Sequence, residues 1–277
     1  MSRSNGYFGR TLRRVFAAAA QQRTTTGEVE FVGAGPGGAE LLTLGALRAL
    51  EAADVVIHDR LVSAEVLALC PAQAERISAG KTGFGPSVAQ GDINEMITDR
   101  ALRGARVVRL KSGDPTVFGR LDEEMDACDA AGVAWRIVPG ITAASAGAAA
   151  IGQSLTRRTR NSSVRMITGH DMAGFAEHDW RALARAGEVA AIYMGTRSAR
   201  FVQGRLMMHG AAPDTAVTLI ENASRPDQRI VATRLADLAD TVEGTVFAGP
   251  VLTFYGLCPR DAVAARMDTP GKKEAAS

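Results

Sequence analysis

The sequence predicts an α/β protein of two domains, and three observations indicate this fold class. A short apolar run, Val29 to Gly33, leads into the glycine-rich turn Gly33-Ala-Gly-Pro-Gly37. Apolar runs then alternate with amphipathic stretches as far as residue 152, as in parallel sheets with helical connections. Beyond residue 215 the apolar runs follow one another closely, which indicates antiparallel or mixed pairing. We therefore expect one domain at residues 28–152 and a second at 153–267.

The first domain is expected to contain a parallel sheet with its ligand-binding loops on one edge. Its five predicted strands are residues 29–33, 54–58, 76–79, 106–110 and 133–138. Leu44, Leu47 and Leu50 form the apolar face of a helix after the first loop, and residues 93–102 are amphipathic at the same period. Strands joined by helical crossovers run parallel, so the loops that follow them share one edge of the sheet.

The second half of the chain begins after a helix of small residues at 143–152. The polar, arginine-rich stretch at 153–163 marks the domain boundary. Strands are predicted at 164–168, 189–194, 216–221, 229–232 and 251–255, and a helix near 199–209. The tail at 268–277 is expected to be disordered.

Composition argues against membrane proteins and metalloproteins. No apolar run reaches the roughly 18 residues of a membrane span, so we expect a soluble, cytoplasmic protein. Cys70, Cys128 and Cys258 stand far apart, and the four histidines show no zinc-ligand spacing. We therefore expect no metal, and thiols that are buried and inert.

The charge of the chain is unevenly distributed. Residues 1–27 hold five arginines and no acid, so the rest of the chain is slightly acidic although the formal net charge is +2. An acidic body argues against a nucleic-acid partner. The basic segment is similar to a transit peptide or, through Arg13 and Arg14, to a twin-arginine signal. Its apolar stretch, Phe16 to Ala20, is too short for export, so residues 1–27 are expected to be a disordered extension.

The glycine-rich turn predicts a nucleotide-like ligand. Gly33-x-Gly35-x-x-Gly38 matches the dinucleotide fingerprint, and Asp59 follows at about the 20-residue distance of the acid that holds a ribose. Pro36 has no N–H group and a fixed φ, which argues against a loop that wraps a pyrophosphate. An adenosine-type ligand without a pyrophosphate is therefore expected.

Together the loops closely resemble those of the uroporphyrinogen-III C-methyltransferases, within the tetrapyrrole methylase family. The likeness extends over about residues 29–256 and keeps the family order. The matching motifs include Gly33-Ala-Gly-Pro-Gly37, Asp59-Arg60-Leu61-Val62, Gly80-Lys81, Arg109-Leu-Lys-Ser-Gly-Asp-Pro115, Val117-Phe-Gly-Arg120, Pro139-Gly-Ile-Thr-Ala143, Tyr193-Met-Gly195, Glu221-Asn-Ala223 and Arg225-Pro-Asp-Gln-Arg229. Many ordered motifs are more specific than one glycine loop.

The resemblance implies a tetrapyrrole methylase fold that binds S-adenosylmethionine in the cleft between its domains. The implied reaction methylates uroporphyrinogen III on rings A and B, giving precorrin-2 through precorrin-1 for sirohaem or cobalamin synthesis, with S-adenosylhomocysteine as the second product. Asp59 matches the family's proposed proton acceptor and Lys81 its proposed proton donor. The family is usually homodimeric. Matched cofactor contacts fall on Pro36, Ser112, Gly113, Asp114, Val117, Thr142, Ala143, Met194 and Ala223.

The substrate implied by the resemblance carries several carboxylates, which guanidinium groups bind in paired geometry. Arg120, Arg157 and Arg158 are therefore the expected substrate-binding residues. The chain also departs from the family pattern, mostly on the presumed substrate side. Ser112 and the pair Leu121-Asp122 replace glycines, Arg157 replaces a histidine, and Ala150 stands where a tyrosine is expected.

Three other functions fit the same residues. A methylase of a later corrin precursor would share the cofactor contacts and differ in product mass. A methyltransferase acting on RNA or on protein is disfavoured by the acidic body. A nucleotide-binding module without catalysis would bind cofactor but transfer no methyl group. The sequence leaves open whether one or two methyl groups are added, and only 27 residues precede the first domain, which favours a stand-alone methylase.

Overall fold

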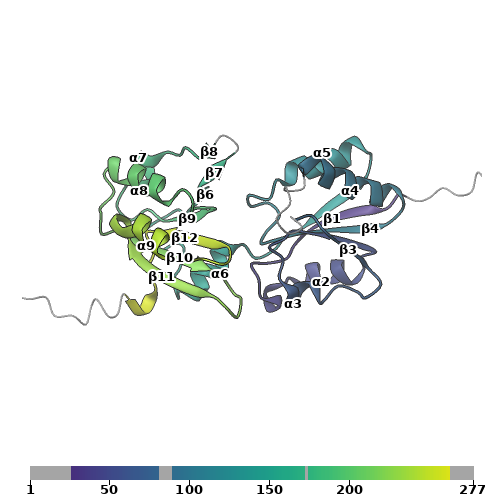
Figure 1. The fold of residues 1–277 in the computed structure, drawn as a ribbon, viewed down its shortest axis with the longest axis horizontal. Helices are drawn as coiled ribbons and strands as arrows, with labels where there is room; N and C mark the ends of the chain where they lie inside the picture. Colours follow the sequence, from purple (N-terminus) through teal and green to yellow (C-terminus); the bar gives the residue numbers. More distant parts are fainter. Residues whose placement is uncertain (1–25, 81–88, 172–173, 263–277) are drawn as a thin grey trace, which may run out of the picture.

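A computed structural model describes residues 26–80, 89–171 and 174–262. Figure 1 shows two lobes joined at a narrow waist, each built on its own sheet. Within the described residues each of these sheets has five strands. The two-domain α/β architecture predicted from the sequence is thus confirmed.

The sheet of the first domain is parallel throughout. It has the order β3-β2-β4-β1-β5, with β1 at Glu28–Gly33, β2 at Val55–His58, β3 at Glu75–Ser78, β4 at Arg106–Lys111 and β5 at Ala134–Val138. The register pairs Gly33 with Lys111, and His58 with Leu110, so these strands end at one edge. The predicted strands and their common loop edge are therefore confirmed.

Helices cover both faces of this sheet (Figure 1). α2 (Leu44–Glu51) and α3 (Ala64–Leu67) lie on one face with the short η1 (Ala39–Leu41), and α4 (Gln90–Leu102) and α5 (Leu121–Ala130) lie on the other. Val32 and Val108 are buried in one core, and their neighbours Phe31 and Val107 are buried in the opposite core. Successive strand residues alternate faces, so a sheet covered on both sides is apolar at consecutive positions.

The sheet of the second domain is mixed. It has the order β11-β10-β12-β9-β6, with β6 at Arg165–Thr168, β9 at Ala190–Tyr193, β10 at Ala216–Glu221, β11 at Arg229–Arg234 and β12 at Val251–Tyr255. The β6–β9 pair is parallel and the other pairs are antiparallel, which confirms the predicted mixed pairing. α7 (Trp180–Leu183), α8 (Ala199–Met208), η2 (Leu235–Asp237) and α9 (Leu238–Gly244) complete this domain.

Two features differ from the sequence-based expectation. The hairpin of β7 (His170–Asp171) and β8 (Gly174–Phe175) was not predicted, because two-residue strands carry no alternating pattern. Helix α6 (Ala143–Ala150), assigned from the sequence to the first domain, packs on the second sheet. A Cβ at Gly147 would lie 3.0 Å from side-chain atoms of Ile220 and Phe254. Small residues allow this close approach, and by its packing α6 belongs with the second domain.

No helix in the described part of the chain combines the length and the apolar character required to cross a bilayer.

Candidate active site

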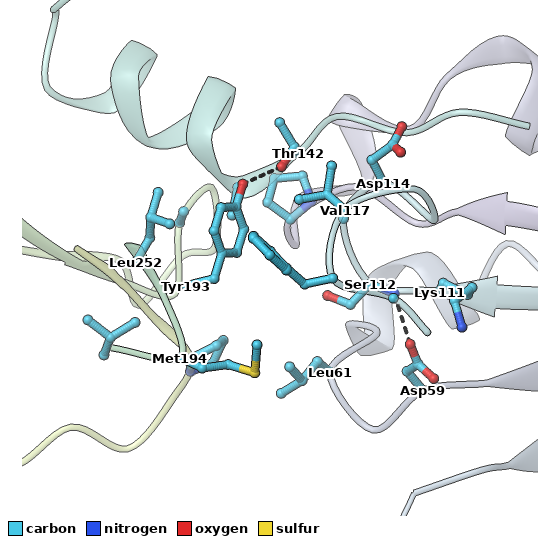
Figure 2. Close-up of a pocket in the computed structure, with 18 of the residues that line it drawn as sticks. Asp59, Leu61, Lys111, Ser112, Asp114, Val117, Thr142, Tyr193, Met194 and Leu252 are labelled. Carbon is cyan, nitrogen blue, oxygen red and sulfur yellow. Dashed lines mark hydrogen bonds between the residues drawn. The ribbon is translucent and has the colours of Figure 1, made fainter. Parts of the chain in front are cut away.

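A cavity of about 240 Å³ lies between the two domains. Its walls are formed by the loops after β1, β2, β4 and β5 and by the facing ends of β9, β10 and β12 (Figure 2). Asp59 lines it, and so do all the residues matched to cofactor contacts, namely Pro36, Ser112, Gly113, Asp114, Val117, Thr142, Ala143, Met194 and Ala223. The fold therefore brings together residues that are far apart in the sequence, and their individual roles stay predictions.

Glycine loops make very close backbone contacts beside the cavity. Gly35 and Gly113 exchange backbone hydrogen bonds of 3.1 and 2.8 Å. A Cβ at Gly140 would lie 2.2 Å from the carbonyl oxygen of Gly113, and a Cβ at Gly33 would lie 2.5 Å from the backbone of Gly140. Residues 33 and 140 must therefore be glycine for these loops to meet.

Asp114 joins two of these loops through its side chain. Its Oδ2 accepts a hydrogen bond from the backbone N–H of Gly140 at 2.9 Å. Its Oδ1 accepts from the backbone N–H and from the hydroxyl of Thr116, at 2.8 and 2.5 Å. Both carboxylate oxygens thus have protein donors, and Asp114 shapes the loop that carries Ser112 and Gly113.

A chain of charged side chains lies behind Asp59. Asp59 Oδ1 accepts from Arg109 Nη2 at 2.5 Å, and its Oδ2 accepts from the Ser112 N–H at 3.3 Å, the contact dashed in Figure 2. Arg109 Nε donates to Glu124 Oε1 at 2.9 Å, and Lys111 Nζ donates to Glu124 Oε2 at 2.7 Å. The side chain of Glu124 has 0% exposure and those of Arg109 and Lys111 have 3%, whereas that of Asp59 has 32%.

Burial has an electrostatic consequence for Lys111. Removal from water, followed by repulsion from Arg109, lowers the pKa of Lys111, while Glu124 opposes this shift. Lys111 also belongs to the residues that line the cavity. A buried ammonium with a single carboxylate partner is therefore placed in the wall beside Asp59.

Sequence reasoning missed Lys111 and Glu124 as site residues, although a signal was present. Arg109 stands on the strand predicted at 106–110 and Lys111 directly follows that strand, so in extended backbone the two side chains share one face of the sheet. Two buried cations on one face require a nearby carboxylate. That carboxylate, Glu124, comes from the first turn of α5, a long-range pairing that no local pattern shows.

The wall contributed by the second domain is mainly apolar. It consists of Ala143 at the start of α6 and of Tyr193, Met194, Ile220, Ala223, Pro250, Val251 and Leu252. The hydroxyls of Tyr193 and Thr142 share a hydrogen bond of 2.5 Å (Figure 2). The N–H of Ala144 donates to the same phenol oxygen at 3.2 Å. Burial raises the pKa of Tyr193, which keeps it a neutral phenol at physiological pH.

Strained backbone is concentrated around the cavity. In the described part of the chain, five residues other than glycine have a positive φ, and each lines the cavity or adjoins a residue that does: Phe118, Arg120, Met194, Asn222 and Ser224. A side chain at positive φ costs roughly 1–3 kcal/mol and is retained where the surroundings determine it. Such strain is typical of ligand-binding walls.

The two walls are also held together directly. The N–H of Gly38 donates to Ser224 Oγ at 3.0 Å, and Arg225 Nη2 donates to the carbonyl oxygen of Leu61 at 2.6 Å. Leu61 lines the cavity. These two bonds and the contact between the Thr142 and Tyr193 hydroxyls join the first domain to the second.

The remaining predicted residues lie elsewhere. Arg120 is 53% exposed and forms a forked pair with Glu123, both bonds being 2.7 Å. Arg157 and Arg158 are exposed and do not line the cavity. Lys81 falls outside the described residues. Substrate binding by these arginines and proton donation by Lys81 stay predictions.

Among the described residues, no cluster of three or more histidine, cysteine or acidic side chains has a geometry suited to a metal ion. The three cysteines are free; Cys70 and Cys128 are buried and Cys258 is half-buried. Burial raises the pKa of Cys128 to about 11, so this thiol is protonated at neutral pH.

Sequence comparison matches most of the chain to one known family. Residues 28–239 match the family described as Tetrapyrrole (Corrin/Porphyrin) Methylases. A siroheme synthase of Edwardsiella ictaluri is 46% identical over 242 residues, which are 87% of this chain and 51% of the relative. A siroheme synthase of Acinetobacter baylyi is 43% identical over 237 residues, which are 86% and 52%. This chain spans about half the length of these curated relatives.

Solved structures match over nearly their full length. A uroporphyrin-III C-methyl transferase from Thermus thermophilus, complexed with S-adenyl homocysteine, has a TM-score of 0.71 at 35% identity, covering 83% of this chain and 97% of that chain. A cobalt precorrin-4 methyltransferase of cobalamin biosynthesis has a TM-score of 0.74 at 27% identity, covering 84% of this chain and 96% of that chain.

Proposed function

Because this chain belongs to the tetrapyrrole methylase family, we propose that it methylates uroporphyrinogen III on rings A and B. S-adenosylmethionine is the methyl donor, and precorrin-2, formed through precorrin-1, is the product. One observation carries this proposal: the nine residues matched to cofactor contacts line a single cavity between the domains. The similarity to the Thermus thermophilus enzyme, solved with S-adenyl homocysteine, supports the same cofactor here.

The cavity has the features that such a ligand requires. Gly113 lines it, and a Cβ at this glycine would meet no atom within 4 Å, so open space lies directly against the loop. A ligand can therefore approach the backbone here without displacing a side chain. The apolar residues of the second wall exclude water from the other side.

The protein's contribution to methyl transfer is positioning and proton movement. S-adenosylmethionine supplies an electrophilic methyl group, and a carbon of the tetrapyrrole attacks it, so no protein nucleophile is required. Holding the reacting groups in line contributes roughly 7–11 kcal/mol. Asp59, which faces the cavity, accepts the proton released from the substrate, and Lys81 is the proposed donor. Arg109 and the Ser112 N–H hold the carboxylate of Asp59 in one orientation.

Substrate carboxylates are proposed to pair with Arg120, Arg157 and Arg158. Arg120 directly follows Gly119, a lining residue, which supports its part in this set. The double variant Arg157→Ala, Arg158→Ala is expected to weaken uroporphyrinogen III binding and to spare S-adenosylhomocysteine. Equal loss of both ligands would instead indicate a structural role. We also propose that the protein is cytoplasmic and forms a homodimer. Light scattering after size-exclusion chromatography tests the homodimer, and cell fractionation tests the location.

A later corrin precursor is the second candidate substrate. The cobalt precorrin-4 methyltransferase superposes with a TM-score of 0.74, against 0.71 for the uroporphyrin-III enzyme. Sequence identity favours the first candidate, at 35% against 27%. A methylase of a later corrin precursor would use the same cofactor residues, so product mass separates the two candidates.

The decisive experiment incubates the purified chain with uroporphyrinogen III and S-adenosylmethionine without oxygen, followed by mass spectrometry. Addition of two methyl groups supports the proposal, and the Asp59→Asn variant serves as the inactive control. A protein that binds S-adenosylhomocysteine but methylates only a later corrin precursor supports the second candidate. Methylation of RNA or protein, or binding without any transfer, contradicts both.

A further inference from the structure

Three charged side chains are buried directly behind Asp59, although buried ion pairs are poor stabilisers of a fold. Arg109 and Lys111 come from β4 and Glu124 from the first turn of α5. With Asp59 they form a group of two cations and two carboxylates. A packed apolar group would fill the same space at lower cost. Their presence at the cavity wall therefore indicates a role beyond stability.

We propose that Glu124 and Lys111 are positioning residues that set how strongly Arg109 holds the carboxylate of Asp59. The inference rests on the proposed function, in which Asp59 accepts a proton. Neither residue touches the reacting atoms in this scheme. Both act through Arg109, and together they determine the net charge that Asp59 faces.

The geometry shows that Arg109 is shared between two carboxylates. Its Nη2 donates to Asp59 and its Nε to Glu124, while Nη1 donates to the carbonyl oxygens of Ile57 and Leu110, each at 3.4 Å. Glu124 therefore offsets part of the guanidinium charge. Lys111 donates to the other oxygen of Glu124 and so offsets part of the negative charge of that carboxylate.

Other polar groups packed around this set are placed differently. Gln90 of α4 donates to Glu124 Oε1 at 3.3 Å. His58 Nδ1 lies 3.1 Å from the backbone carbonyl oxygen of Asp59, and Arg60 is exposed. Asp114 is engaged by Gly140 and Thr116, and the neighbouring Glu123 pairs with Arg120. In the described ranges, Arg109 is the charged side chain that hydrogen-bonds to the Asp59 carboxylate.

Single substitutions of the two positioning residues should act in opposite directions. Glu124→Gln removes the negative charge that offsets Arg109. Arg109 then stabilises the ionised carboxylate of Asp59 more strongly, which makes that carboxylate a weaker proton acceptor. Lys111→Met removes a positive charge, so Glu124 offsets a larger part of the Arg109 charge. Asp59 then becomes easier to protonate. A role confined to packing predicts no such opposition.

The test is the pH dependence of kcat with uroporphyrinogen III and S-adenosylmethionine. The acid limb, on which activity is lost as pH falls, is expected to move down by about one pH unit in Glu124→Gln and up by about one unit in Lys111→Met. The double variant restores the charge balance, and its acid limb should return to the wild-type position. S-adenosylhomocysteine affinity should stay within about 2-fold of wild type in Glu124→Gln, because Glu124 does not line the cavity.

A milder variant keeps the test decisive if a single substitution prevents folding. Gln90 is a half-buried residue of α4 that already donates to Glu124 Oε1. Gln90→Lys brings an ammonium to this carboxylate, so the new positive charge has Glu124 as its partner. Its acid limb should move in the same direction as that of Glu124→Gln. Unshifted limbs in the folded variants, or shifts of the same sign in Glu124→Gln and Lys111→Met, would overturn the inference.

The outcome also separates this inference from the function on which it rests. If the wild-type protein does not methylate uroporphyrinogen III, the proposed function fails and the inference fails with it. If the wild-type protein is active and the acid limbs do not move, only the roles of Glu124 and Lys111 are rejected.

Discussion

The two walls of the cavity differ in their chemistry. Among the described residues that line it, the charged ones, Asp59, Lys111 and Asp114, all come from the first domain. The second domain contributes aliphatic side chains, the thioether of Met194, a proline and the neutral phenol of Tyr193. Loops that leave one edge of a parallel sheet converge and can gather charges. The antiparallel strand ends opposite them supply a shaped apolar surface, so the first wall is suited to proton transfer and the second to holding the ligand.

Two buried glutamates show the same difference. Glu124 in the first domain binds two cationic side chains. Glu221 in the second domain accepts from the N–H groups of Ala248 and Gly249, at 2.5 and 2.7 Å, and from Arg229 Nε at 2.6 Å. One carboxylate therefore organises charge, and the other fixes the backbone that precedes Pro250 in the apolar wall.

The largest effect is expected at the first wall, from Asp59→Asn. Loss of the proton acceptor should lower turnover by roughly 10²–10⁴-fold while S-adenosylhomocysteine affinity is retained, because shape and most hydrogen bonds persist. Steady-state kinetics and calorimetry measure the two quantities. If Asp59 held the ribose instead, the Michaelis constant for S-adenosylmethionine would rise and turnover would recover at saturation. That result would contradict the assignment of proton transfer to the first wall and of ligand binding to the second.

Gly113, which lines the first wall, and Gly140 in the loop beside it test shape without changing charge. Gly140→Ala places a methyl group 2.2 Å from the Gly113 carbonyl oxygen, so the loops must separate at a cost of about 1–3 kcal/mol or more. Gly113→Ala meets open space and adds strain of about 1 kcal/mol at φ +75°. Thermal unfolding should therefore show the larger loss for Gly140→Ala. Both variants should bind S-adenosylhomocysteine more weakly, and unchanged affinity in both would remove these loops from the ligand site.

Glu221→Gln tests whether a buried carboxylate beside the second wall affects stability and leaves proton transfer unchanged. The charge-assisted bonds to Arg229 and to two backbone N–H groups are weakened, which should lower the free energy of unfolding by about 1.5–3 kcal/mol. Ligand affinity should fall with stability, whereas the pH profile of kcat should keep its acid limb. The exposed Glu243, paired with Arg200, provides the matched control. Glu243→Gln should change neither the free energy of unfolding nor the ligand affinity. A shifted acid limb in Glu221→Gln would contradict the assignment of charge effects to the first wall.

The smallest effect is expected where the walls meet. Tyr193→Phe removes the phenol hydroxyl that bonds to Thr142 and Ala144, at a cost of about 1 kcal/mol, or roughly a 5-fold loss of S-adenosylhomocysteine affinity. Thr142→Val should be less than additive with it, because both remove the same bond. Full additivity in calorimetric affinities would show that the hydroxyls act separately.

The sequence by itself determined the fold class and the composition of most of the cavity wall. Strand and helix patterns are local. The buried strand predicted at residues 54–58 is apolar at three consecutive positions, 55–57, and a glycine such as Gly140 marks a backbone that approaches another closely. The ordered motifs then identified residues of both domains that line one cavity, from Pro36 to Ala223. The resemblance of these motifs to a known family carried this information, and each motif is a short loop at a strand end.

Only the tertiary structure decided which distant side chains meet. The pairing of Glu124 with Arg109 and Lys111, the contact of Tyr193 with Thr142, and the packing of α6 on the second sheet all join segments with no shared local pattern. A buried charge must find a partner, and a run of small residues must find a surface, but which partner and which surface depend on how the two sheets are placed. For that reason the charge group behind Asp59 became visible only in the folded chain.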